Sequence, residues 1–287
     1  MAGSDDAPVA AADEALYVLT AALLTPAQFP SVLGDDYPAA CAALGLTPLD
    51  EGYGLVLGQD GEGARWTAVI DDVSLVAVAI ASWDCGMEYE LSPDGRTVVA
   101  ALPGWPLALA VAAPDVPAPH DPVTDATDQP PLTPPDTRTW GAAQRRLAAD
   151  EIALRWAEWR GRLDNAAVLP GERPSGTAAP ALETAPDTQP EPEGTAKRGH
   201  PGVRQALAEA HAYIDTPPPL GRVRSSFAPG DARTLRADGP GWSIVARTDD
   251  IAFVLLDAEP GEVIPVGRGP ELPGLLEGLD KIAVRPL

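Results

Sequence analysis

Basic residues, and lysine above all, are scarce in this chain. Of its 287 residues, 20 are Lys or Arg and 42 are Asp or Glu, which gives a formal net charge of −22. Lys197 and Lys281 are the only lysines. A protein that binds duplex nucleic acid needs a basic surface, so this balance argues against nucleic acid as a direct ligand.

Residues with AT-rich codons are rare as a group, since Asn165 is the only asparagine. This usage is typical of a bacterium with a high-GC genome. Such hosts favour acidic proteins in general, so the acidity alone is weak evidence of function.

Cysteine and long apolar runs are also scarce. The chain has two cysteines, Cys41 and Cys85, and its N-terminus has neither the basic nor the apolar region of an export signal. The most apolar stretch, Thr97–Ala113, is interrupted by two prolines and is shorter than the roughly 20 residues that a spanning helix needs. The sequence therefore predicts a cytoplasmic protein without a membrane partner.

Motifs for cofactor binding and catalysis are missing. The sequence has no Walker A motif, dinucleotide fingerprint, Cys-x-x-Cys pair or His-Glu-x-x-His motif. His120, His200 and His211 all lie beyond residue 113, which excludes a Cys–His or Ser–His–Asp arrangement within the first part of the chain. We expect no cofactor, and the sequence favours a non-catalytic protein.

Two tracts rich in Pro, Thr, Ala and Asp divide the chain, at 114–135 and 165–198. Segments of this composition bury too little apolar surface to offset the entropy lost on ordering, so we expect linkers. They separate an acidic α+β domain at 10–113, a basic amphipathic helix at 136–164 and a second α+β domain at 199–287.

The first domain is predicted to place helices on an antiparallel meander. Leucines at helical spacing predict a helix over Asp13–Leu24, and helical turns follow at Ala27–Leu33 and Pro38–Leu44. Apolar or alternating runs separated by turn residues then predict strands joined as hairpins. These runs are Gly54–Leu57, Arg65–Ile70, Val73–Ser82, Met87–Leu91, Thr97–Leu102 and Leu107–Ala112.

The middle segment predicts one helix with Thr139 as its N-cap. Its apolar face has helical spacing and consists of Ile152, Trp156, Trp159 and Leu163. Six arginines lie between Arg138 and Arg162, which makes this the only basic segment. Its natural partner is an acidic surface.

The second domain repeats the order of helix and meander. A helix is predicted from Pro201 to Ile214, and a short helix from Leu272 to Leu279. The predicted strands are Leu220–Phe227, Ala232–Ala237, Trp242–Arg247, Ile251–Leu256, Val263–Val266 and Lys281–Val284. The predicted fold class is therefore α+β.

An internal duplication is one interpretation of this order. Trp66–Val76 and Trp242–Val254 both contain a Trp, a hydroxyl residue, an apolar strand, an Asp-Asp pair and a second apolar strand. The alternative is two unrelated hairpins, since Trp favours sheets and Asp favours turns.

A carboxylate trio supplies the one hypothesis of catalysis. Glu88 and Glu90 would project from the same face of a strand, and Asp84 could approach them. The trio could bind a hard cation in a metal-dependent hydrolase. The same alternation is also typical of a strand with one solvated face.

Charge distribution favours protein binding. Residues 1–111 contain sixteen acidic side chains against Arg65 and Arg96. This surface could bind a basic protein, dock the chain's own 138–163 helix, or only keep the protein soluble. Candidate contact residues are Trp105, Trp156, Trp159, Asp71 and Asp72.

The sequence thus favours a non-catalytic protein–protein interaction module of the adaptor, chaperone-like or immunity/inhibitor type. The first alternative is the hydrolase that uses Asp84, Glu88 and Glu90. The second is a structural or assembly component of a phage, plasmid or developmental system.

Overall fold

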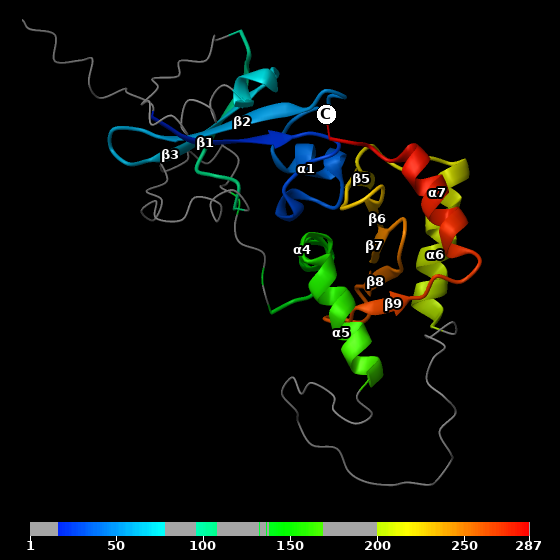
Figure 1. The fold of residues 1–287 in the computed structure, drawn as a ribbon. Coiled ribbons are helices and arrows are strands. Elements are labelled where there is room, and N and C mark those ends of the chain that lie inside the picture. Colours follow the sequence, from blue (N-terminus) through cyan, green and yellow to red (C-terminus); the bar gives the residue numbers. More distant parts are fainter. Residues whose placement is uncertain are drawn as a thin grey trace, which may run out of the picture.

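Two antiparallel sheets organise the chain (Figure 1). The computed structural model describes residues 17–77, 96–107, 132, 136, 138–168 and 200–286. The sheets have strand orders β1-β2-β3-β4 and β5-β6-β7-β8-β9 and are accompanied by helices, so the predicted α+β class is confirmed. We call residues 17–77 and 96–107 the first module, and residues 138–168 and 200–286 the second module.

The first sheet is a meander of four antiparallel strands. They are β1 (Tyr17–Leu24), β2 (Tyr53–Gln59), β3 (Arg65–Ile70) and β4 (Val98–Pro103). β3 has the predicted bounds, and β2 and β4 extend or shift theirs by one or two residues. The predicted strand Met87–Leu91 and almost all of both Pro-rich tracts lie outside the described residues.

The helix predicted over Asp13–Leu24 is wrong for residues 17–24, which form β1. The reason is tertiary pairing. β2 is buried along nearly its whole length and needs a neighbour on each side, and β1 pairs with it from Tyr17 opposite Gln59 to Leu24 opposite Tyr53. Pairing of this kind overrides helical spacing in a segment that also contains β-branched and aromatic residues.

The strand predicted over Val73–Ser82 is also wrong where the structure describes it. Ser74–Ala77 form a helical turn, and the Asp72 carboxylate accepts hydrogen bonds from the backbone and hydroxyl of Ser74. Asp249 and Asp250, by contrast, lie between the paired strands β7 and β8. The two Asp-Asp pairs thus have different backbone settings, and the duplication stays a prediction.

Two short helical elements cover one face of the first sheet. The helical turn predicted over Ala27–Leu33 is limited to the 3₁₀ helix η1 (Ser31–Leu33), and α1 spans Tyr37–Ala43 with Asp36 as its N-cap. Tyr37 and Leu33 pack with Leu55 and Leu57 of β2. This layer places the segment between β1 and α1 at the edge of the first module.

The second sheet has helices on one face from the C-terminal part of the chain. Its strands are β5 (Val223–Phe227), β6 (Arg233–Gly239), β7 (Trp242–Arg247), β8 (Ala252–Leu256) and β9 (Ile264–Val266). α6 (Pro201–Asp215) and α7 (Leu272–Ile282) pack on Leu235, Trp242 and Val254. α7 occupies the start of the strand predicted at Lys281–Val284, of which only a single bridge from Val284 to Arg224 exists.

The opposite face of the second sheet is covered by the middle segment (Figure 1). The single helix predicted there is two helices, α4 (Ala142–Leu154) and α5 (Trp156–Val168), and Gly141 rather than Thr139 is the N-cap. The backbone of Arg155 leaves the helical region at φ −113 and ψ 40, which separates them. Among the helices of the described residues, none has the length and apolarity needed to cross a bilayer.

Side chains alternate between the two faces of the second sheet, and those on the face that α4 covers form an apolar region and a polar region. The apolar region consists of Val245, Phe253 and Leu255, which pack on Ile152 and Trp156. The polar region consists of Arg224, Arg236, Asp238 and Ser243. The first module contacts this polar region.

Candidate functional site: a buried charged junction

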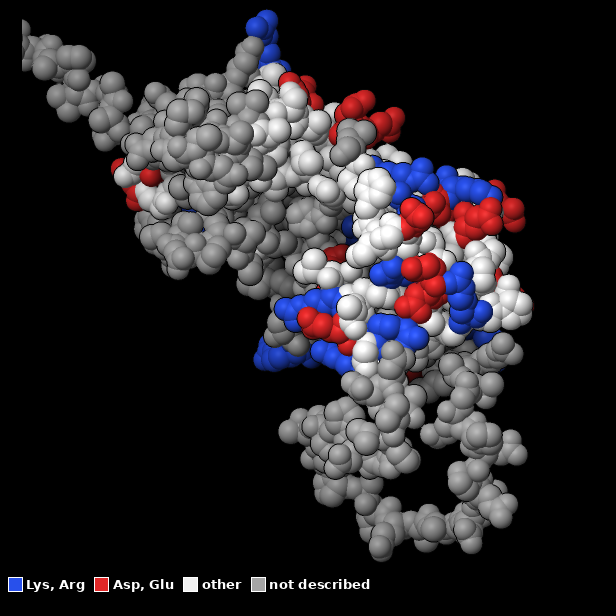
Figure 2. Space-filling model, viewed as in Figure 1, with Lys and Arg blue, Asp and Glu red and all other residues white. Residues whose placement is uncertain are grey.

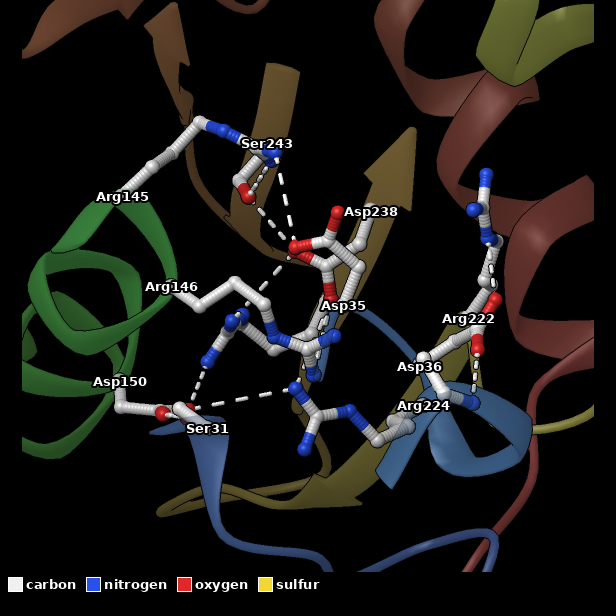
Figure 3. Close-up of polar contacts among 12 residues, drawn as sticks. Ser31, Asp35, Asp36, Arg145, Arg146, Asp150, Arg222, Arg224, Asp238 and Ser243 are labelled. Atoms are coloured by element: carbon white, nitrogen blue, oxygen red, sulfur yellow. Dashed lines mark hydrogen bonds and ion pairs between the residues drawn. The ribbon is translucent and has the colours of Figure 1, made fainter. Parts of the chain in front are cut away.

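Charged side chains from three parts of the chain meet where the two modules touch (Figure 3). α4 contributes Arg145, Arg146 and Asp150, and the segment between β1 and α1 contributes Ser31, Asp35 and Asp36. The second sheet and the loop before it contribute Arg222, Arg224, Arg236, Asp238 and Ser243. We call this set the charged junction.

Asp238 lies at the centre of the charged junction. It is 1% exposed, and its carboxylate oxygens lie 3.6 Å from Arg146, 3.5 Å from Arg224 and 3.6 Å from Arg236. Its one close hydrogen bond comes from the Ser243 hydroxyl at 2.6 Å. One carboxylate therefore faces three guanidinium groups.

Asp150 links the two modules through α4. Its carboxylate accepts hydrogen bonds from the Ser31 hydroxyl of the first module and from Arg236 of the second sheet. A further nitrogen of Arg224 lies 4.0 Å away.

Phe29 closes the charged junction from the side of the first module. The guanidinium carbon of Arg146 lies 4.4 Å from the centre of its ring, and that of Arg224 lies 4.6 Å from it. Stacking of this kind is favourable when the cation is desolvated. The ring also belongs to the first module's core, so it joins that core to the second module.

Ion pairs flank the centre on both sides. Arg145 donates to Asp257 at 2.7 Å and to Ser243 at 2.7 Å, and it lies 3.9 Å from Asp35. On the other side Arg222 donates to Asp36 at 2.7 Å.

The backbone at Gly221 allows this close approach. Gly221 has φ +89, and a Cβ there would lie 2.7 Å from the Cβ of Tyr37 and 2.8 Å from the carbonyl oxygen of Pro26. A side chain at position 221 would push the modules apart.

The electrostatic balance differs from group to group. Burial alone would raise the pKa of Asp238, but Arg146, Arg236 and Arg224 hold it well below its usual range. Burial lowers the pKa of Arg146, and burial together with the neighbouring Arg236 lowers that of Arg224 to about 10. Burial raises the pKa of Asp35 despite the nearby arginines. The field at Asp238 is therefore positive.

The depressed pKa of Asp238 predicts a pH-dependent contribution to stability. Its carboxylate stabilises the fold fully above its unfolded pKa of about 3.9, and this stabilisation is lost as the pH falls towards the folded pKa. We expect the difference in unfolding free energy between the wild type and Asp238→Asn to be constant above about pH 5 and to shrink below about pH 4. Urea unfolding at a series of pH values measures it.

Asp35→Asn provides the contrast to that experiment. The folded pKa of Asp35 is raised, so its ionisation costs stability at higher pH, and this cost disappears as the pH falls. The two variants should therefore show opposite trends. A difference for Asp238→Asn that stays constant down to pH 3 would contradict the depressed pKa.

The predicted contact tryptophans are packed against other residues. Trp105 is 7% exposed, its indole donates to the Gly58 carbonyl, and Arg65 stacks on it at 4.2 Å. Trp156 is 8% exposed and contacts the Phe253 ring, as does the partly buried Trp159.

The predicted carboxylates lie away from the charged junction or outside the structure. Asp71 and Asp72 are exposed at the end of β3. Asp84, Glu88 and Glu90 lie outside the described residues. Within the part of the chain that is described, no three His, Cys, Asp or Glu side chains gather as metal ligands would.

Sequence reasoning missed the residues of the charged junction. The available signal was the alternation Leu235-Arg236-Ala237-Asp238, which indicates a strand with one polar face. That pattern is typical of a solvated face, and it carries no information that α4 and the first module cover it.

Searches for similar proteins found none: no family model, curated protein or solved structure matches the chain. In the charged junction Arg145 and Arg222 of the second module pair with Asp35 and Asp36 of the first, and Arg146 and Arg224 stack on Phe29, an arrangement suited to holding the modules together.

Proposed function

We propose that the protein is a non-catalytic protein-interaction module that binds a basic protein surface through the acidic exterior of its first module. The observation that supports this is the segregation of charge. Arginines gather in the charged junction, where the first module supplies only Asp35 and Asp36, and its other described carboxylates lie outside the junction.

The charged side chains on the exterior of the first module are mostly acidic where it is described. Its only basic residues there are Arg65, which is 4% exposed and stacks on Trp105, and the exposed Arg96. The exposed acidic side chains are Asp50, Glu51, Glu62, Asp71 and Asp72. Little positive charge is left at this surface to neutralise them.

The second module differs because its exterior mixes both signs. On the face shown in Figure 2, blue and red atoms lie next to each other over this module. Exposed pairs include Lys281 with Glu277 at 2.8 Å and Arg285 with Asp280 at 3.2 Å. Such pairs cancel at long range, so between the two described modules the net negative charge lies mainly on the first.

A surface of one sign accelerates association with a surface of the opposite sign. Screening by salt weakens this attraction beyond about 8–10 Å at physiological ionic strength. The proposal therefore predicts binding that depends strongly on salt. The identity of the partner decides whether the protein acts as an adaptor, a chaperone-like carrier or an inhibitor.

The test compares capture of basic proteins by the wild type and by a neutralised first module. The variant carries Asp50→Asn, Glu51→Gln, Asp71→Asn and Asp72→Asn, all at exposed positions. We expect the wild type to enrich a basic protein from a lysate of a high-GC bacterium at low salt. The variant should associate with that protein at a rate lower by a factor of about ten or more. Mass spectrometry identifies the partner, and surface plasmon resonance gives the rate.

The matched control removes four exposed carboxylates from the second module. It carries Asp215→Asn, Asp231→Asn, Glu262→Gln and Glu271→Gln, which change the net charge equally. The control should bind as the wild type does. Equal loss in both variants, or no basic partner at low salt, would contradict the proposal.

A further inference from the structure

Among the buried side-chain atoms of the charged junction that lack a hydrogen-bond partner, donors outnumber acceptors. Eight guanidinium nitrogens are buried without a hydrogen-bond partner in the protein, against the two carboxylate oxygens Asp35 Oδ1 and Asp238 Oδ2. The nitrogens are Arg145 Nη2, Arg146 Nε, Nη1 and Nη2, Arg224 Nε and Nη2, and Arg236 Nε and Nη2. Buried polar groups are almost always paired, so these donors call for a further acceptor.

The distances around Asp238 show why the donors stay unpaired. Its contacts to Arg146, Arg224 and Arg236 are 3.5–3.6 Å, whereas charge-assisted hydrogen bonds are about 2.7–2.9 Å. The three guanidinium groups are thus close enough to attract the carboxylate electrostatically without donating to it. Arg146 makes no hydrogen bond through any of its three nitrogens.

Three guanidinium groups share two carboxylates at ion-pair distance within this inner group. Arg146, Arg224 and Arg236 are opposed there by Asp238 and Asp150, and Asp35 attracts Arg146 from farther away. The lowered pKa of Arg224, caused by burial and by the neighbouring Arg236, agrees with crowding of like charge. An additional anion would relieve it.

The unpartnered groups are mostly hydrogen-bond donors, so a suitable ligand must supply acceptors. A water molecule accepts hydrogen bonds but brings two donors of its own, for which this site offers few acceptors. A tetrahedral oxyanion brings only acceptors, and guanidinium groups match its oxygens in pairs.

We infer that the charged junction binds a small tetrahedral oxyanion, inorganic phosphate or sulfate, between Arg146, Arg224 and Arg236. The ion is free rather than part of a larger molecule, because Arg145 and Arg146 are 0% exposed and Phe29 covers the group from the first module. Binding therefore stabilises the contact between the two modules. Loss of the ion leaves like charges facing one another.

The test titrates sodium phosphate and sodium sulfate into the full-length chain. Isothermal calorimetry should give a saturable heat. The melting temperature should rise at millimolar anion relative to chloride of equal ionic strength, since a ligand of the folded state stabilises it. The low concentration separates binding from the general stabilising effect of these salts.

Variants assign the binding to the inner arginines. Arg146→Met should abolish the saturable heat, and Arg224→Lys, which keeps the charge but loses the planar group of donors, should weaken binding at least about tenfold. Arg162→Met is the control: Arg162 is exposed on α5, stacks on Trp159 and should not affect binding. Arg224→Lys decides the question if Arg146→Met fails to fold.

The outcomes that overturn the inference are definite. No saturable heat with either anion, or unchanged affinity in Arg224→Lys, would show that the buried donors do not form an oxyanion site. Adenosine monophosphate and a phosphoserine peptide form a further arm of the test. Binding of either as tight as that of the free ion would refute the assignment to a small ion.

Discussion

Replacing Asp238 with asparagine is expected to lower the free energy of unfolding by about 3–5 kcal/mol. The reason is that Asp238 is 1% exposed and faces Arg146, Arg224 and Arg236. Asparagine keeps the shape but removes the charge, so buried guanidinium groups lose their central counter-ion. Urea unfolding at neutral pH, followed by tryptophan fluorescence, measures the loss.

Asp249→Asn is the matched control. Asp249 pairs with Arg247 at 2.8 Å, but its side chain is 53% exposed. Exposed ion pairs contribute only about 0–1 kcal/mol. If both variants lost similar stability, Asp238 would not be the centre of the charged junction.

Replacing Phe253 with alanine should have an effect of similar size, about 3–5 kcal/mol. Phe253 is 1% exposed on β8, and its ring makes edge-to-face contacts with Trp156 at 5.2 Å and Trp159 at 6.4 Å. Truncation leaves a cavity between α5 and the second sheet. We therefore expect faster hydrogen exchange in α4 and α5 as well as lower stability in urea.

Phe227→Ala makes the same chemical change at an exposed site. Phe227 is 84% exposed at the end of β5, where Arg233 lies 4.8 Å from the ring centre. Its loss should cost no more than about 0.5–1 kcal/mol. A large loss here, or a small one for Phe253→Ala, would show that the α4–α5 layer is not held by the aromatic cluster.

Strands with strong local signals were predictable from the sequence. β3 and β7 have the predicted bounds because each is an apolar run between turn residues. β1 was not predictable, because its leucine spacing favours a helix and only pairing with β2 makes it a strand. The break at Arg155 was also hidden, because a periodic pattern continues through it.

The charged junction depends on contacts that no local pattern encodes. The middle helix was recognised as basic and amphipathic, yet its apolar residues pack on β8 and its arginines contact segments of both modules. The residues involved are ordinary in their local context: a Phe after a turn, alternating charges in a strand. Their contacts with one another form only when the two modules pack together.

The spacing of these contacts along the chain sets the order in which the protein assembles. Ser31 bonds to Asp150 across 119 residues, and Arg222 bonds to Asp36 across 186. Contacts this distant in sequence form late, because both partners must first be synthesised and folded locally. During synthesis Phe29 therefore lacks its contacts with Arg146 and Arg224, and Asp36 lacks its bond to Arg222, until these arginines have emerged. The junction is complete only once β6, which carries Arg236 and Asp238, has been synthesised.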